Sequence, residues 1–414
     1  MPANPRLAVG LVTLSLGVAV GAQRQGVFDA TRDTPTINYS KGSLDNPVER
    51  LNQQLADGQA KLAAQPVSGY LRSTLDALQV PVESQVLVFS QTSLQSSRIS
   101  PTNPRAVFFN DSVAVAWVRG SDGLEVAVQD LRQGAVFYRL GQSAATPRFE
   151  RDDTCLACHL TWETLGVPGL MVLSTFPMAD DPHAYARGFV SDHRSPIAQR
   201  WGGWYVTGQA PSVHMGNVPT LLPVGTRVSP GQRAPVLASV QGRFDLTGFL
   251  SPHSDVAALL VLEHQSAMVN FITRLGWEAR LVPAAPKRVE EAASALVDYL
   301  LFVDEDPLPG AVRGSSTFAE VFSARGPRDP AGRSLYQLDL QRRLLKHRCS
   351  YMIYSPAFDA LPATAKSAVY ERLWKVLSGQ VTGAPYSTLA RPERAAIIEI
   401  LAATKRDLPD YFKP

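Results

Sequence analysis

Residues 106–140, AVFFNDSVAVAWVRGSDGLEVAVQDLRQGAVFYRL, contain four short runs rich in Val, Phe, Trp and Tyr, separated by turn-forming residues. Residues of these types favour β-strands, and breakers such as Asn-Asp or Ser-Asp-Gly end them. Within this stretch, 118–126 (VRGSDGLEV) is typical of a β-hairpin. Because no connection here is long enough for a crossover helix, consecutive strands should run antiparallel. Together with a further run at 86–90, the pattern predicts an antiparallel sheet in the first half of the chain.

The second half of the chain has the periodicity of helices. Apolar residues recur at spacings of three and four in 251–280, 289–303, 361–377 and 392–404. The sequence therefore predicts an α+β fold, with an N-terminal to central antiparallel sheet followed by a mostly helical C-terminal region. The expected parts are a signal peptide (1–22), an N-terminal helical segment (23–84), a β-rich domain (85–220), an irregular connection (221–250) and the helical region (251–414).

The N-terminus has the pattern of a secretory signal peptide. An apolar run at 7–20 follows the basic residue Arg6, and small residues precede Gln23. The run is too short to span the roughly 30 Å hydrocarbon core of a membrane as a helix. We expect cleavage after Ala22, a periplasmic or otherwise exported location and no transmembrane span in the mature chain. A buried N-terminal helix or an uncleaved anchor is the alternative interpretation. The formal net charge of +3 gives no reason to expect nucleic acid as a partner.

Shortly after the predicted sheet, residues 155–159 are CLACH, two cysteines three positions apart with a histidine directly after the second. A zinc site needs about four Cys or His ligands, and no second C-x-x-C or H-x-x-x-H pattern occurs. A thioredoxin-like dithiol begins a helix after a strand, whereas the residues before Cys155 are polar and turn-like. A local disulfide or chance is a third interpretation. Covalent attachment of haem c is the fourth, and the pattern favours it.

The spacing suits haem attachment for a chemical reason. Thiols at positions i and i+3 lie on one side of a helical turn, so Cys155 and Cys158 can each bond one former vinyl group of the same porphyrin. The imidazole of His159 then points at the iron as its proximal ligand. The third cysteine of the chain, Cys349, lies next to an apolar run and is interpreted as a small buried side chain.

The C-x-x-C-H motif resembles the attachment signature of c-type cytochromes. Beyond it, the chain resembles large single-haem cytochrome c domain proteins of environmental bacteria over roughly 85–220 and 330–414, through stretches such as SDHRSPIAQRWGGWYVTG, HMGN and CSYMIYSPAFDALP. The resemblance implies one covalently attached haem c and an exported location, and no particular substrate. Small soluble cytochromes c place the motif near their N-terminus, unlike this chain. A compact sheet followed by the motif is instead similar in order to exported PAS-like domains that hold haem c.

The sixth iron position requires a histidine or methionine that can reach the distal face. We favour His214 or Met215, which lie on a predicted loop after an aromatic strand, and then His193; an open sixth position is the alternative. Trp201 and Trp204 are candidate walls of a porphyrin pocket, and Arg200 is a candidate partner for its carboxylates. Further candidate iron ligands are Met171, Met178, His183, His253, His264, Met268 and His347, and further candidate cations are Arg151, Arg187 and Arg194.

These observations favour an electron-transfer cytochrome that works with an unidentified periplasmic redox partner protein. Two alternatives stay open: a haem c sensor or binding module, and a haem enzyme such as a peroxidase. The sequence contains no Gly-rich phosphate loop, H-E-x-x-H or G-x-S-x-G motif. Electron transfer, rather than catalysis, is therefore the expectation.

Overall fold

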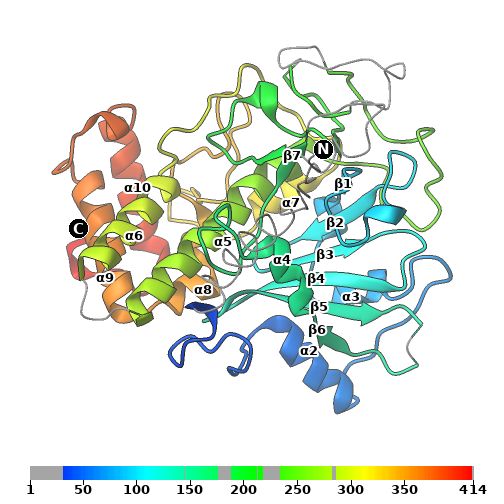
Figure 1. The fold of residues 1–414 in the computed structure, drawn as a ribbon. Coiled ribbons are helices and arrows are strands. Elements are labelled where there is room, and N and C mark those ends of the chain that lie inside the picture. The colour runs from blue at the N-terminus through cyan, green and yellow to red at the C-terminus, as the bar shows by residue number, and fades with distance from the viewer. Residues whose placement is uncertain are drawn as a thin grey trace, which may run out of the picture.

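The computed structural model describes residues 31–143, 145–175, 188–211, 213–217, 234–281 and 286–412. These residues form an α+β fold, with an antiparallel sheet in the first half and helices in the second (Figure 1), as predicted. The predicted signal peptide (1–22) lies outside the described residues, as do Met178, His183 and Arg187.

The main sheet has seven strands in the order β6-β5-β4-β3-β2-β1-β9, and all its pairs are antiparallel. β1 to β5 lie where the sequence predicts them, within two residues at either end, and β9 is the aromatic strand expected before His214. β6 and the separate two-stranded sheet β7–β8 were not expected, because their three-residue strands are too short to show a period. The strands are β1 (Val86–Val88), β2 (Arg105–Phe109), β3 (Val113–Trp117), β4 (Gly123–Asp130), β5 (Gly134–Gly141), β6 (Phe149–Arg151), β7 (Leu173–Thr175), β8 (Gly188–Val190) and β9 (Trp204–Tyr205).

Helices precede and follow the sheet. The helix predicted over 251–280 begins only at Val256, because the carboxylate of Asp255 accepts hydrogen bonds from the amides of Ala257 and Ala258 and caps it there. The α-helices are α2 (Pro47–Ala56), α3 (Leu71–Ala77), α4 (Leu156–His159), α5 (Val256–Leu281), α6 (Pro286–Leu300), α7 (Phe318–Ala324), α8 (Pro356–Asp359), α9 (Ala363–Leu377) and α10 (Arg391–Thr404). Short 3₁₀ helices lie at Val82–Ser84, Ser96–Arg98, Asp153–Cys155, Ile197–Gln199, Tyr351–Tyr354, Ala384–Tyr386 and Asp410–Phe412.

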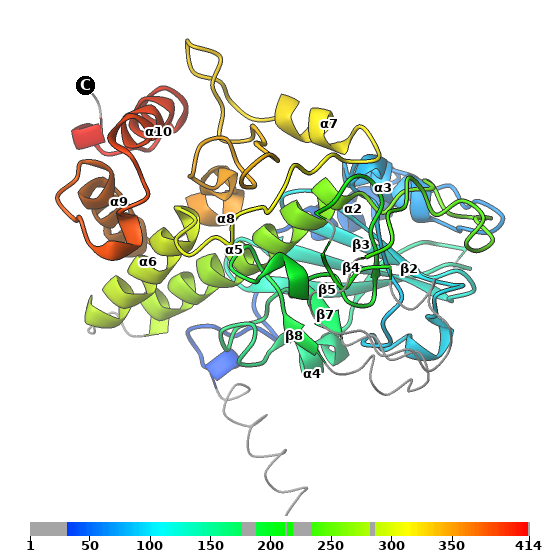
Figure 2. The ribbon, with the colours of Figure 1, turned by 90° about the horizontal axis from the view of Figure 1, so that it is seen from above.

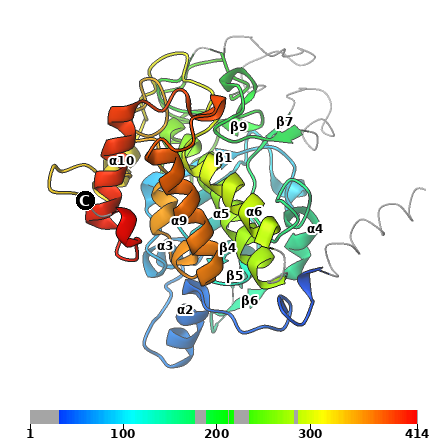
Figure 3. The same ribbon diagram turned by 90° about the vertical axis from the view of Figure 1, so that its left-hand side faces the viewer.

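α5 is the central helix of the molecule. It runs between the sheet and the helices α6, α9 and α10 (Figures 2 and 3). Its 26 residues are long and apolar enough to cross a membrane, and 89% of its most apolar window is buried inside the protein. A buried core helix has this composition. This helix is only weak evidence for a membrane span, and the expectation that the mature chain has none stays a prediction.

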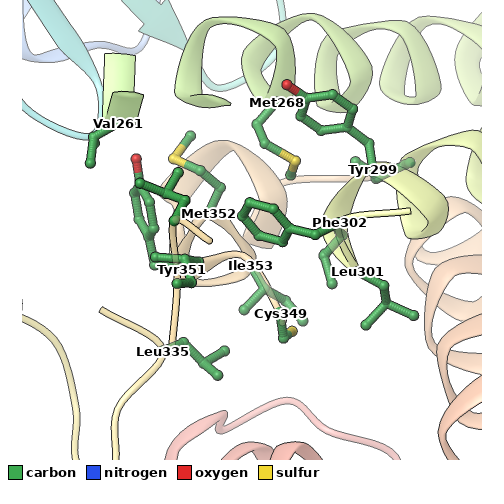
Figure 4. Close-up of a cluster of buried hydrophobic side chains, with 14 of the residues drawn as sticks. Val261, Met268, Tyr299, Leu301, Phe302, Leu335, Cys349, Tyr351, Met352 and Ile353 are labelled. Carbon is green, nitrogen blue, oxygen red and sulfur yellow. The ribbon is translucent and has the colours of Figure 1, made fainter. Parts of the chain in front are cut away.

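The helical half packs into an apolar core that also includes strand residues such as Val88, Phe109 and Trp204. Figure 4 shows Met268 of α5 packing near Tyr299 and Phe302 at the end of α6, with Cys349 in the same cluster. The Cys349 side chain is fully buried, and burial raises the pKa of its thiol. The sequence interpretation of Cys349 as a small buried residue is confirmed.

The two faces of the main sheet are covered differently. Figure 2 shows α3 on one side of the sheet and α4 with β7 and β8 on the other. On the α3 side, strand residues such as Val113, Val115 and Trp117 are fully buried. On the α4 side, cover is less complete, and this is the side on which the CLACH segment lies.

Candidate functional site

The CLACH segment folds as a 3₁₀ turn that continues into α4. Asp152 caps the turn by accepting a hydrogen bond from the Thr154 amide at 3.1 Å. The turn leaves Cys155 half-buried and Cys158 exposed, and both thiols are free. Burial raises the pKa of Cys155 to about 12, because a thiolate loses its hydration there.

The imidazole of His159 is held by the loop that follows it. Its Nδ1 lies 2.9 Å from the carbonyl oxygen of Gly169, and the Gly169 amide donates back to the His159 carbonyl at 2.9 Å. Since a carbonyl only accepts, Nδ1 must carry the proton and Nε2 keeps its lone pair. Burial lowers the pKa of His159 to about 4, so the ring is neutral near pH 7. A neutral histidine whose second nitrogen is tied to a backbone carbonyl is the usual state of a metal ligand.

α5 fixes that loop in turn. The side-chain amide of Asn270 accepts from the Leu170 amide at 2.8 Å and donates to the Leu170 carbonyl at 2.7 Å. A Cβ atom at Gly169 would lie 2.2 Å from Asn270 Oδ1, so only glycine allows this close approach. The orientation of His159 thus depends on a clamp from the central helix.

A pocket lies between the sheet, α4 and α5, and the motif forms one of its walls. Its cavity volume is about 180 Å³, and it is partly open to solvent. Its lining comprises Val88, Ser90, Thr92, Ser93, Leu94, Arg105, Val107, Ala114, Ala116, Glu125, Val126, Ala127, Phe137, Tyr138, Thr154, Cys155, Cys158, His159, Leu170, Met171, Val172, Leu173, Trp204, Leu262 and Ser266.

The floor of the pocket is a flat patch of small and apolar strand residues. Ala114 of β3 and Ala127 of β4 are directly paired, and Ala127 is also paired with Phe137 of β5. Ala114, Ala127 and Val107 are only half-buried, although they lie near the middle of a sheet covered on both faces. Alanines here leave room that larger side chains would fill. A flat, apolar and incompletely covered surface suits a flat apolar ligand.

One ion pair lies in this pocket. Arg105 of β2 and Glu125 of β4 are 2.5 Å apart and about three-quarters buried. The Nε atom of Arg105 is buried and has no hydrogen-bond acceptor among the residues that the structure describes. Arg105 is also the only Lys or Arg among the described residues that line the pocket.

Comparison with known proteins finds no similar protein. No protein-family model, no curated protein and no solved structure matches this chain. Within the described ranges, no group of three or more His, Cys, Asp or Glu side chains is placed to hold a metal ion. A structural zinc site would need such a group.

The structure separates the candidate pocket residues of the sequence. Trp204 lines the pocket with the motif, whereas Trp201, Arg200, His193, His214 and Met215 do not. Trp201 is fully buried and packs edge-on against His214, 5.1 Å between ring centroids. Of the further candidates that the structure describes, Met171 lines the pocket, and His253, His264, Met268, His347, Arg151 and Arg194 do not.

Arg200 and His193 belong to a buried network next to α5. Arg200 pairs with Glu263 at 3.3 Å and donates to the His193 carbonyl at 2.9 Å. The His193 and His264 rings stack, with their Nδ1 atoms 2.9 Å apart. Burial lowers the pKa of both histidines and raises that of Glu263. The network joins loop 191–200 to α5 at a point without access to solvent.

Sequence reasoning missed Arg105 and Glu125 and did not favour Met171. A signal for Met171 exists, because Gly166, Pro168 and Gly169 turn the chain back soon after His159. Arg105 and Glu125 face the pocket because of their register: Arg105 is opposite Val88, which is opposite Trp204, and Glu125 is opposite Ala116. Residues that are directly paired point to the same face of a sheet.

Proposed function

We propose that this protein is an exported monohaem c-type cytochrome that transfers electrons to or from a periplasmic redox partner protein. One haem is joined to Cys155 and Cys158, and Nε2 of His159 binds its iron. The observation that most favours this proposal is the hydrogen bond from His159 Nδ1 to the Gly169 carbonyl, since it leaves a neutral imidazole with a free lone pair directly beside two free thiols. When bound, the haem supplies a one-electron Fe(III)/Fe(II) couple.

The surrounding residues fit a porphyrin. The half-buried floor around Ala114 and Ala127 gives a flat apolar surface, and Trp204 and Phe137 add aromatic rings. The buried, unpaired Nε of Arg105 provides a donor for an anionic group. When haem is bound, these residues would cover part of it, and such cover helps to set the reduction potential.

We propose Met171 as the sixth ligand. Among the described residues that line the pocket, His159 and Met171 are the only histidine and methionine. Of the residues favoured by the sequence, His214 packs against Trp201, and the Met215 amide donates to the Arg200 carbonyl. A thioether ligand opposite a histidine favours the ferrous state and raises the reduction potential, which suits an electron carrier.

A second candidate function is a haem c sensor. Leu262 and Ser266 of α5 line the pocket, and the same helix packs against α6 and α9. A ligand that displaced the sixth group would therefore act on a helix shared with the whole C-terminal region. The order of sheet and motif, which is similar to that of exported PAS-like domains that hold haem c, also supports this second proposal.

The test is production of the chain with a c-haem maturation system in a bacterial periplasm. The proposal expects a mass gain of one haem, lost in Cys155→Ala/Cys158→Ala, and a six-coordinate low-spin spectrum that carbon monoxide does not change in the ferrous state. Met171→Ala should lose the near-infrared sulfur-to-iron band, whereas Met215→Leu, the matched control, should keep it.

Three results would count against these proposals. A colourless protein with the mass of the bare polypeptide would end the cytochrome proposal. A five-coordinate spectrum in the wild type would favour the sensor. Loss of the sulfur-to-iron band in Met215→Leu and not in Met171→Ala would reject Met171.

A further inference from the structure

The Arg105–Glu125 ion pair is unusual in its position. It lies in the pocket that contains His159 and both motif cysteines, with side chains about three-quarters buried. Most ion pairs on strands stay at the solvent, where they contribute little to stability. Burying two charged side chains costs free energy of desolvation, and we therefore look for a function that explains the position of this pair.

Arg105 has unused hydrogen-bonding capacity. One terminal nitrogen contacts Glu125, and the buried Nε has no acceptor among the described residues. A guanidinium group has five N–H donors and binds carboxylates in a fixed planar geometry. Buried donors in native proteins are nearly always satisfied, so an acceptor should arrive with a ligand.

The porphyrin of the proposed function provides that acceptor. Its apolar body matches the alanine floor, and its edge bears two carboxylates. Arg105 is the only cationic side chain among the described pocket-lining residues, and it is also among the charges that act on His159 and Cys155. The candidate cations of the sequence that the structure describes have other partners: Asp153 for Arg151, the Tyr299 ring for Arg194 and Glu263 for Arg200.

We infer that Arg105 receives a carboxylate of the bound haem and that Glu125 is a positioning residue that holds the guanidinium over the pocket. The inference rests on the proposed function. Arg105 stabilises the added electron of the ferrous haem, and Glu125 opposes it, so the pair sets the reduction potential from within the pocket.

The structure provides a matched control. Arg139 of β5 lies directly opposite Glu125 in the sheet and is ion-paired at 2.6 Å, but to Asp122. It is half-exposed and does not line the pocket. Arg139→Gln thus removes the same charge from a neighbouring strand without touching the pocket.

The experiment compares haem-loaded wild type, Arg105→Gln, Arg105→Lys, Glu125→Gln and Arg139→Gln by spectroelectrochemistry and by the resonance Raman band of the haem carboxylates. The expected result is a lower reduction potential in Arg105→Gln, a smaller fall in Arg105→Lys, a rise in Glu125→Gln and little change in Arg139→Gln. The carboxylate band should move in Arg105→Gln only, or more than in any other variant.

The inference is overturned if the potential of Arg105→Gln equals that of Arg139→Gln, if Arg105→Gln and Glu125→Gln shift the potential in the same direction, or if the carboxylate band does not respond to Arg105. Any of these outcomes is expected if the Arg105–Glu125 ion pair only joins β2 to β4 and does not contact the haem. Failure of the wild type to attach haem would instead reject the proposed function, so the two failures are distinguishable.

Discussion

His159 Nδ1 and the carbonyl oxygen of Gly169 are 2.9 Å apart, and the same two residues share a second hydrogen bond between their backbones. Residues 159–169 therefore form a closed loop of eleven residues, whose two ends are joined at His159 and Gly169. α5 holds this loop through the two hydrogen bonds of Asn270 to Leu170. The state of the histidine is thus determined by a helix that begins about a hundred residues later in the sequence.

Asn270→Ala should loosen this arrangement. The substitution leaves the Leu170 amide without its acceptor and the Leu170 carbonyl without its donor. Leaving buried backbone groups without partners costs about 1–3 kcal/mol. We expect the free energy of unfolding to fall by this amount. In ferrous, haem-loaded protein whose sixth position is opened by Met171→Ala, we also expect the iron–histidine band of the resonance Raman spectrum to shift or broaden. Thr273→Val, which removes a hydrogen bond within α5 itself, is the control. If both variants give the same band as their parent, the clamp does not act on His159.

The three cysteines should differ in reactivity in haem-free protein. Cys158 is exposed, whereas burial raises the pKa of Cys155 to about 12 and Cys349 is fully buried. Because the thiolate is the nucleophile, Cys155 should react with iodoacetamide at pH 8 roughly a thousandfold more slowly than an ordinary cysteine. Peptide mass spectrometry over time should show Cys158 modified first and Cys349 last. Equal rates in the native protein, matching those in denaturant, would contradict the described positions.

A larger side chain on the floor of the pocket should reduce haem attachment without destabilising the fold. Ala127→Leu adds an apolar side chain to a half-buried position that faces open space. The haem-free protein should keep its stability within about 1 kcal/mol, since no packed core is disturbed. Haem attachment should fall sharply, measured as haem absorbance per protein. Ala402→Leu, at a half-buried position on α10, should leave attachment unchanged; normal attachment in Ala127→Leu would show that the porphyrin lies elsewhere.

Arg200 should prove structural. Its side chain and that of Glu263 are 2% and 0% exposed. Removing one partner of a buried ion pair leaves the other uncompensated and costs about 3–5 kcal/mol. Arg200→Met should therefore lower the free energy of unfolding by that amount, whereas Arg139→Gln, in an exposed pair, should cost less than about 1 kcal/mol. Denaturant titration measures both, and a stable Arg200→Met protein would contradict the network.

The sequence predicts the sheet well because its strands are local patterns. Val113, Val115 and Trp117 alternate with smaller residues, and this period is visible without tertiary information. The pocket depends on which strands become neighbours. Ala114 and Ala127 meet only through the register of β3 and β4, and Arg105 and Glu125 lie two strands apart.

The candidate iron ligands show the same limit. His214 and Met215 have suitable chemistry, but their loop packs against Trp201 and Arg200 instead of the motif. Met171 follows a turn that Gly166, Pro168 and Gly169 predict, but only the closure of Gly169 onto His159 brings it to the pocket. Residue type indicates what a side chain can bind, whereas loop closure determines what it meets.

The haem-free protein should lose stability in mild acid because it buries neutral histidines. Burial lowers the pKa of His214 to about 4 and that of His264 to about 3, whereas an unfolded histidine has a pKa near 6.5. The unfolded state therefore binds protons first as the pH falls below about 6.5. The stability from each neutral ring is complete above that pH and decreases until the folded pKa is reached.

Between pH 7 and pH 5 each such histidine should cost about 2 kcal/mol of unfolding free energy. Glu305, whose pKa burial raises to about 7, acts in the opposite direction, since its folded form takes up a proton over the same range. His214→Gln keeps Glu305 and removes one histidine. Urea titrations at pH 7 and pH 5 should then show a loss about 2 kcal/mol smaller in His214→Gln than in the wild type. Equal losses in the two proteins would mean that His214 is not buried in the neutral form.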